Sequence, residues 1–266
     1  WAEIDLETTE LTVAAVEAVL SSKTKLVAIT GAGNTIGTRP DLKAIGVAVH
    51  KVGALFYVDG VHLTPHAAIS AKEIGADFFG LSFYKLMGPH CAALAASPAL
   101  LETLNNDKLL PATSAVPERF EFGTLPYELM AGCIAAIDFI AEMAPGNGTT
   151  RREKIVNSMN ALEKYEDGLL EYLESSVKAL PGVVMYGHAK HRTPTIYFSC
   201  VGHSSADIYA AMASKGVTLP ASNFYALEVS RKLGLGDSGA LRAGLAPYSI
   251  KDDVDRLVGG LKEILA

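Results

Sequence analysis

The sequence has little cysteine, no long apolar run and no excess of positive charge. Its three cysteines, Cys91, Cys133 and Cys200, form no CxxC pair, which favours a reduced, cytoplasmic protein over a disulfide framework. No stretch reaches the about 18 uninterrupted apolar residues that indicate a membrane span. Lysine and arginine total 23 against 29 aspartate and glutamate, a net charge of −6, which argues against nucleic acid as the main partner.

The first residues resemble the interior of a domain rather than a natural start. The chain begins at Trp1 and continues as WAEIDLETTELT, without the charged segment and apolar run of a signal peptide. We therefore expect an N-terminally incomplete domain. The 266 residues are 49% hydrophobic, enough for one large core or two smaller ones.

Hydrophobic patterning predicts an α/β chain with two domains. Strands and helices alternate in the first part, which predicts a βαβ unit and a mainly parallel sheet. The segment APGNGTT is the predicted boundary between a large domain, 1–145, and a small α/β domain, 146–266. The predicted strands are 25–30, 54–59, 76–82, 91–97, 183–186, 194–200, 217–220 and 240–245, and the predicted helices are 11–21, 41–53, 127–143, 151–179, 204–215 and 251–265.

Polar residues stand where three of these strands end. Asn34 follows the first strand in GAGNTIGT, Asp59 ends the second in YVDGVH, and Ser82 ends the third, with Lys85 three residues later in SFYKLMGPH. Asp59 lies 25 residues after Asn34 and 26 before Lys85, close to one βα unit each. Ligands of parallel sheets bind beyond the carboxyl ends of the strands, so we expect an amide, a carboxylate, a hydroxyl and an amine at one edge.

This set of groups suits pyridoxal 5′-phosphate. A lysine amine forms an imine with the aldehyde, and a carboxylate beside the pyridine nitrogen makes the ring an electron sink. Hydroxyls and loop N–H groups can hold the phosphate. Taken singly, Asp59 and Asn34 are ordinary turn residues and Lys85 is an ordinary surface charge. Their joint spacing and strand-end placement favour the cofactor interpretation.

The same residues carry a family resemblance. The segment TKLVAIT through YKLMGPH, then PERFEFGTLPYELMAG, then ALRAGLAPYSIKDDVDRLV, resemble class V aminotransferases of the cysteine desulfurase-like group. The resemblance covers essentially the whole chain, with the motifs in the same order. It implies a pyridoxal-phosphate transferase-like fold (fold type I), with a partial large domain, a small C-terminal domain and a homodimer that shares its active sites.

The resemblance also implies a role for individual residues. Lys85 is the imine lysine, which then serves as general base and acid on an amino-acid substrate. The implied contacts are Asp59 to the pyridine nitrogen, His62 to the phenolic oxygen with Asn34 nearby, Ser82 to the phosphate, Gly123 and Thr124 to the phosphate in the partner subunit, and Arg242 to the substrate α-carboxylate. Transamination, elimination, racemisation and desulfuration remain open.

The chain departs from the family in three places. Tyr84 precedes the lysine where many relatives carry histidine. The desulfurase cysteine lies on a loop before the Arg242 strand, but TLPASNFYALEVSRKLGLGDSGALR contains none. The three cysteines are expected to be small buried hydrophobes, so persulfide chemistry by the usual route is not expected. The family's N-terminal segment, with a phosphate loop and a ring-stacking residue, has no counterpart.

A nucleotide-binding dehydrogenase is an alternative. KLVAITGAGNTIG resembles a strand and glycine-rich loop, Asp59 could bind a ribose, and Tyr186 and Lys190 have Tyr-x-x-x-Lys spacing. However, Ile36 occupies the last glycine position, Arg39-Pro40 interrupts the expected helix, and Tyr186 comes directly after the apolar run VVM of a predicted strand, not on a helix face. These departures weaken the dehydrogenase interpretation.

Two further alternatives are a metal site and a non-catalytic module. His62, His66 and His90 have no joining carboxylate or cysteine at ligand spacing, and Pro65 breaks helical geometry, so we expect no metal. A truncated family member could also serve as a binding or dimerisation module, because two predicted helices are long and amphipathic.

Overall fold

The chain forms two compact units in a computed structural model that describes residues 1–144, 146 and 148–266. The parallel-sheet unit comprises Leu20–Gly31 and Leu42–Met159, and the antiparallel-sheet unit comprises Trp1–Val19, Ala32–Asp41 and Asn160–Ala266. This division differs from a single boundary between 145 and 146. The predicted linker contains residues 145 and 147, which lie outside the described residues.

Two N-terminal segments join the antiparallel-sheet unit because their backbones bond to it. His188 N donates to Thr8 O at 3.1 Å, and Arg39 N donates to His191 O at 2.9 Å. The hydroxyls of Thr9 and Thr38 also bond to each other at 3.0 Å. These contacts connect positions far apart along the chain, so sequence periodicity does not reveal them.

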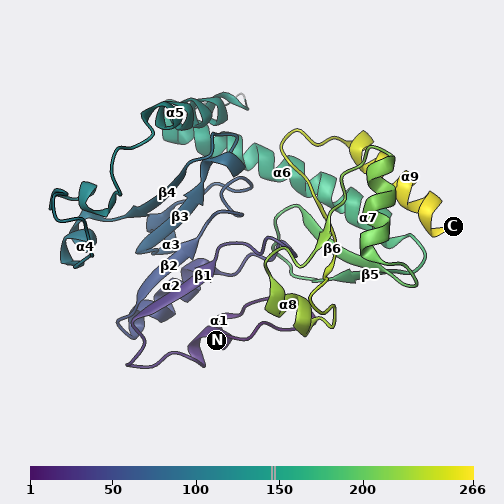
Figure 1. Cartoon of the computed structure of the whole chain (residues 1–266), viewed down its shortest axis with the longest axis horizontal. Helices are drawn as coiled ribbons and strands as arrows, with labels where there is room; N and C mark the ends of the chain where they lie inside the picture. The colour runs from purple at the N-terminus through teal and green to yellow at the C-terminus, as the bar shows by residue number, and fades with distance from the viewer. Residues whose placement is uncertain (145, 147) are drawn as a thin grey trace. The chain divides into compact units, whose positions relative to one another are not determined.

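The parallel-sheet unit contains four strands in the order β1-β2-β3-β4 (Figure 1). These are β1 (Leu26–Thr30), β2 (Leu55–Asp59), β3 (Phe78–Ser82) and β4 (Ala92–Ala96). β1, β2 and β3 are parallel, whereas β4 is antiparallel to β3. The predicted βαβ unit is therefore present, and the carboxyl ends of three strands lie at one edge.

Helix α2 (Leu42–Lys51) is the crossover between β1 and β2. It is amphipathic, and its Ile45 and Val49 are fully buried, as is Phe56 of β2. Burying each such side chain contributes about 1.5–3 kcal/mol to stability. The other helices of this unit are α3 (Ala71–Ile74), η1 (Phe83–Lys85), α4 (Pro98–Thr103), η2 (Glu118–Phe120) and α5 (Tyr127–Glu142).

The antiparallel-sheet unit has the strand order β5-β6-β8-β7, with every pair antiparallel. The strands are β5 (Val183–Tyr186), β6 (Thr195–Cys200), β7 (Ala221–Ser222) and β8 (Ala240–Gly244). The strand predicted at 217–220 is wrong, because pairing with β8 begins only after Pro220. Pro220 has no N–H to donate, and it contributes only its carbonyl, which accepts from Arg242 N at 3.0 Å.

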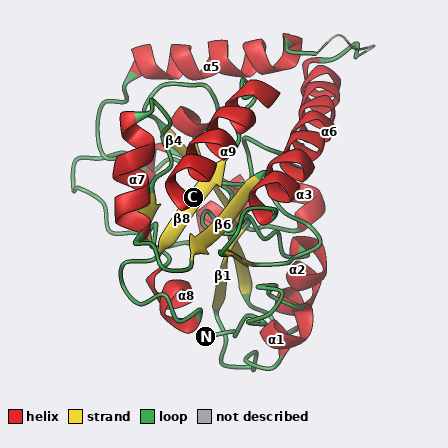
Figure 2. Cartoon of the chain, turned by 90° about the vertical axis from the view of Figure 1, so that its right-hand side faces the viewer, coloured by secondary structure: helices red, strands yellow, loops and turns green. Residues whose placement is uncertain are grey.

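Helices cover this second sheet, and Figure 2 shows α9 in front of β6 and β8 with α7 beside them. Phe198 of β6, Met212 of α7 and Leu261 of α9 are fully buried in one cluster. The helices are α1 (Val13–Glu17), α6 (Arg151–Lys178, from Asn160 onward), α7 (Ser205–Ser214), α8 (Leu227–Lys232) and α9 (Lys251–Leu265). Among the residues that the structure describes, no helix has the length and apolar character needed to cross a membrane.

Candidate active site

The carboxyl edge of the parallel sheet carries a hollow of about 410 Å³. Asp59 ends β2 beside Gly80 of β3, and Ser82 ends β3 two residues further on. Both Asp59 and Ser82 line the hollow, together with Tyr57, Val61, Gly80, Leu81 and residues 92–94. The structure thus brings the predicted carboxylate and the predicted hydroxyl to one concave surface.

A short turn after β2 orients the Asp59 carboxylate. Its Oδ1 accepts a hydrogen bond from Val61 N at 2.9 Å, the Asx-turn geometry that aspartate favours at strand ends. The Asp59 backbone carbonyl accepts from Gly31 N at 2.7 Å, which joins the ends of β1 and β2. Val61 is not among the residues predicted from the sequence, although its position two residues after a strand-end aspartate indicates this turn.

Lys85 lies in η1, the single 3₁₀ turn directly after β3, and its side chain is exposed. Its Nζ lies 5.8 Å from the centroid of the Tyr84 ring. Tyr84 in turn stacks on His90, with centroids 5.1 Å apart and ring planes at 11°. The turn is closed by Gly88 N donating to Phe83 O at 2.8 Å. The amine is therefore presented by a well-defined turn at the end of a central strand.

His62 lies in the loop after β2 and is half-buried. Its ring faces that of His66 edge-on, with centroids 5.4 Å apart. Within residues 1–144, 146 and 148–266, no group of three or more His, Cys, Asp or Glu side chains could hold a metal ion.

Gly123 and Thr124 are exposed in the segment that leads into α5. Gly123 has a φ of 111°, a conformation that favours glycine. These residues belong to the parallel-sheet unit but do not line its hollow.

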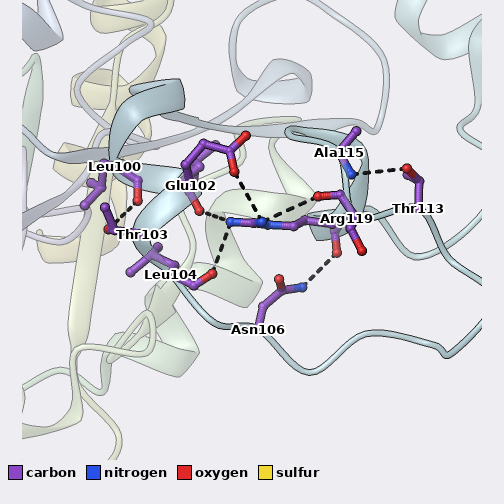
Figure 3. A network of polar contacts seen from close by, with 10 residues as sticks. Leu100, Glu102, Thr103, Leu104, Asn106, Thr113, Ala115 and Arg119 are labelled. Carbon is purple, nitrogen blue, oxygen red and sulfur yellow. Dashed lines mark hydrogen bonds and ion pairs between the residues drawn. The ribbon is translucent and has the colours of Figure 1, made fainter.

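Arg119 organises the segment before Gly123 and Thr124 (Figure 3). Its guanidinium donates to the carbonyls of Leu101 and Leu104, the latter at 3.1 Å. Asn106 Nδ2 donates to Arg119 O at 2.8 Å. One half-buried arginine thus ties the end of α4 to the loop that follows it.

Arg242 and Asn34 form a second cluster, in the antiparallel-sheet unit. Arg242 of β8 donates from Nη1 to Asn34 O at 2.8 Å. Asn34 Nδ2 donates to Phe224 O at 2.8 Å, and the Phe224 ring centroid lies 3.9 Å from Arg242 Cζ. Burial lowers the pKa of the Arg242 guanidinium, yet an arginine stays charged in proteins. Phe224 is not predictable from the sequence, because nothing local marks it as a neighbour of Arg242.

The predicted site residues therefore fall into two groups. Asn34 and Arg242 contact each other, and Asp59 and Ser82 line one hollow, with Lys85 on the next turn. The roles that the resemblance implies for these residues remain predictions.

The cysteines are mostly structural. Cys133 and Cys200 are buried as expected, whereas Cys91 is only half-buried. Burial raises the pKa of both the Cys133 and the Cys200 thiol, and a contact with the Cys91 thiol adds to the effect on Cys133. A raised pKa disfavours the nucleophilic thiolate.

The glycine-rich loop after β1 does not have dinucleotide-binding geometry. Helix α2 begins only at Leu42, whereas a dinucleotide fingerprint needs the loop to open a helix directly. Residues 32–41 instead join the antiparallel-sheet unit, where Thr38 forms an isolated antiparallel β-bridge with Arg192. This geometry counts against the dehydrogenase alternative.

Solved structures define the fold. The crystal structure of the cysteine desulfurase CsdA from Escherichia coli matches with a TM-score of 0.85 at 24% identity, covering 100% of this chain and 65% of that chain. The apo structure of a cysteine desulfurase from Thermococcus onnurineus NA1 matches with a TM-score of 0.83 at 23% identity, covering 98% and 64%. The fold is that of the pyridoxal-phosphate transferases of fold type I, which confirms the fold class predicted from the sequence.

Sequence comparison gives the family. The profile described as Aminotransferase class-V matches residues 2–257. An uncharacterized protein of Mycobacterium tuberculosis is 30% identical over 266 residues, covering 99% of this chain and 66% of the relative. The aminotransferase-like protein FGM3 of Gibberella zeae is 32% identical over 273 residues, covering 100% and 65%. The chain belongs to the class-V aminotransferase family, as its motifs predicted, and spans just under two thirds of the length of these relatives.

Proposed function

We propose that this chain binds pyridoxal 5′-phosphate at the carboxyl edge of its parallel sheet and, within a complete enzyme, acts on an amino-acid substrate. One observation carries the proposal: Asp59 and Ser82 line one hollow, and Lys85 stands on the turn directly after β3. Class-V aminotransferases are generally dependent on this cofactor. Membership of the family supports the same assignment.

The groups at the sheet edge fit the ring and amine end of the cofactor. The hollow of about 410 Å³ falls within the roughly 300–1,000 Å³ of small-molecule sites. Asp59 supplies a carboxylate to its wall, and the lysine that must bond the aldehyde carbon is exposed on the adjacent turn. When bound, the cofactor supplies an electron sink for the bonds of the substrate α-carbon.

Four predicted site residues of the parallel-sheet unit then have a defined task each. Asp59, oriented by Val61 N, holds a proton on the pyridine nitrogen. With the cofactor bound, Lys85 would hold it covalently through Nζ and, once released, would take and return the proton at the substrate α-carbon. Ser82 would donate a hydrogen bond from its hydroxyl to the phosphate, and His62 would donate one to the phenolic oxygen.

Arg242 binds the α-carboxylate of the substrate. Its planar guanidinium can donate two parallel hydrogen bonds to an α-carboxylate. The bond from Nη1 to Asn34 O restricts the rotation of the fork, which lowers the conformational entropy lost on binding.

A second copy of the chain is part of the proposal. The exposure of Gly123 and Thr124 supports their predicted task of reaching the phosphate in a partner subunit. Helix α5, which follows them, exposes the large apolar side chains of Tyr127, Ile134 and Phe139. Exposed large apolar side chains of this kind often mark a protein interface.

The test is a titration of the purified chain with pyridoxal 5′-phosphate, followed by visible absorbance. We expect a cofactor band with wild type and with Lys72→Ala, a matched control for the exposed lysine of α3. Lys85→Ala should lose the band. A band of equal strength in Lys85→Ala, or loss of the band in both variants, contradicts the assignment of Lys85.

A further inference from the structure

The turn between β7 and α8 has an unusual backbone. Two consecutive residues other than glycine have positive φ there, 50° at Phe224 and 66° at Tyr225. Bulky side chains disfavour this region, which glycine, asparagine and aspartate adopt more readily. A turn that needed only this geometry would be built more easily from those residues, so an aromatic side chain at 224 indicates a use for the ring itself.

Hydrogen bonds within the turn hold its conformation. Phe224 N donates to Ser222 Oγ at 3.1 Å, and Tyr225 N donates to Asn223 Oδ1 at 2.9 Å. Asn223 Nδ2 also donates to Asp237 O at 2.8 Å. These side chains satisfy the backbone locally, as is typical of Asx and Ser turns.

Two outer contacts fix the turn against its unit. Asn34 Nδ2 donates to Phe224 O at 2.8 Å, and Tyr197 Oη donates to Ser222 O at 2.9 Å. Tyr197 is a fully buried residue of β6. The turn is therefore held at two backbone carbonyls, those of Ser222 and Phe224.

The result of this geometry is a covered guanidinium. The Phe224 ring centroid lies 3.9 Å from Arg242 Cζ, well within cation–π range. Asn34 O occupies an N–H of Nη1 on the same guanidinium. An arginine carries five N–H donors in a rigid fork; among the described residues the bond to Asn34 O occupies one of them, so other donors can serve a ligand.

We propose that Phe224 is a positioning residue that, together with Asn34 O, holds the Arg242 guanidinium plane ready for an α-carboxylate. The inference rests on the proposed function, because it takes Arg242 as the carboxylate-binding residue. It adds that the preference of the site for a carboxylate over its amide depends on an aromatic face at position 224. Burial of Arg242, which lowers its pKa, strengthens a cation–π contact by removing competing water.

A purely structural role for Phe224 makes a different prediction. Phe224 also packs beside Ile36, Tyr197 and Ala240. Phe224→Leu keeps an apolar side chain in this cluster but removes the π face, whereas Phe224→Tyr keeps both. If Phe224 is purely structural, Phe224→Leu should behave like wild type. If Phe224 positions Arg242, only Phe224→Tyr should behave like wild type.

The first measurement needs neither cofactor nor substrate. In the full ¹⁵N-labelled chain, the Nε–Hε resonance of Arg242, assigned with Arg242→Lys, reports the ring current and the solvent exchange of the guanidinium. We expect Phe224→Leu to shift this resonance downfield and to speed its exchange about two- to thirtyfold, the range of a cation–π contact. Phe224→Tyr should preserve both values. An unchanged resonance and exchange rate in a folded Phe224→Leu protein overturn the proposal.

The second measurement compares the cofactor-loaded protein's affinity for L-alanine with that for L-alaninamide. We expect Phe224→Leu to reduce the preference for the carboxylate about two- to thirtyfold and Phe224→Tyr to retain it. If wild type and Arg242→Lys show no preference, the carboxylate role of Arg242 fails. If wild type shows the preference and Phe224→Leu keeps it in full, only the positioning role fails. Should Phe224→Leu not fold, Asn34→Ala, which removes the bond to Phe224 O, must give the same two changes, and their absence overturns the proposal.

Discussion

Arg242 donates from Nη1 to the backbone carbonyl of Asn34 at 2.8 Å, a contact between residues 208 positions apart. The loop after β1 thereby meets β8, and the residue that the sequence placed at the sheet edge contacts the predicted carboxylate-binding arginine. A main-chain acceptor orients the fork without neutralising it, so the full positive charge remains for a substrate.

Loss of Arg242 should weaken substrate binding without affecting cofactor attachment. Arg242→Ala removes a charged bidentate donor, which typically costs about 2–4 kcal/mol, or about thirtyfold to a thousandfold in affinity. The check is a titration of the cofactor-loaded protein with amino acids. Arg256→Ala is the matched control. Arg256 lies on α9 and also donates to a backbone carbonyl, that of Gly216, at 3.3 Å. Equal losses in both variants would count against a specific role for Arg242.

The core of the antiparallel-sheet unit should depend strongly on Phe198. This side chain is fully buried, so Phe198→Ala should lower the free energy of unfolding by about 3–5 kcal/mol. Val201, which is 70% exposed, gives a control whose alanine variant should change stability by less than about 0.5 kcal/mol. Urea denaturation measures both, and a small loss in Phe198→Ala would show that this core is misassigned.

Arg119 should control the order of the segment before Gly123 and Thr124. Arg119→Ala removes the side-chain donor that joins the Leu101 and Leu104 carbonyls (Figure 3). Amide exchange across residues 98–121 should then accelerate about tenfold or more. Arg151→Ala removes a half-exposed ion pair with Asp138 and a 3.5 Å hydrogen bond to Ile134 O, both outside residues 98–121, and should leave exchange in that segment unchanged. Identical amide exchange across residues 98–121 in both variants would contradict this role of Arg119.

The start of α6 should contribute a pH-dependent term to stability. Glu153 Oε2 accepts from Thr149 N at 2.8 Å and Thr150 N at 2.9 Å. These hydrogen bonds, with Thr150 N–H the largest cause, lower the pKa of Glu153 from 4.5 to about 2. A lowered pKa means that the carboxylate stabilises the folded state above about pH 4.5 and loses this effect as the pH falls towards 2.

Glu153→Gln should therefore be less stable than wild type at pH 7, with the difference disappearing between about pH 4.5 and pH 2. Thermal unfolding across this pH range is the measurement. Glu7→Gln, a substitution of an exposed residue, is the control. A Glu153→Gln defect that persists at pH 2 would mean that the hydrogen bonds do not act through the charge.

Local pattern was sufficient for the parts of the fold with strong periodicity. β2 and β3 are short apolar runs that end on a polar residue, and α5, α6 and α9 carry long helical patterns. These elements were predicted to within a few residues. The fold class and the family followed from motifs in order along the chain, and both are confirmed.

Contacts distant in sequence were not predictable in this way. Residues 32–41 join the antiparallel-sheet unit through bonds to residues 191–193, which no local pattern encodes. Helix α8 was missed because its six residues are too few to show a period. The Phe224 ring contacts Arg242 from a turn in which two residues adopt positive φ, a conformation against their own preference.

Reductive labelling identifies the lysine that bonds the cofactor and so tests the assignment of Lys85. The chain is incubated with limiting pyridoxal 5′-phosphate, reduced with borohydride, digested, and its peptides are mapped by mass spectrometry. We predict that the label concentrates on Lys85 and that Lys72, also exposed, stays essentially unlabelled at the same concentration. Labelling spread evenly over the exposed lysines, or concentrated on a lysine other than Lys85, would contradict the account.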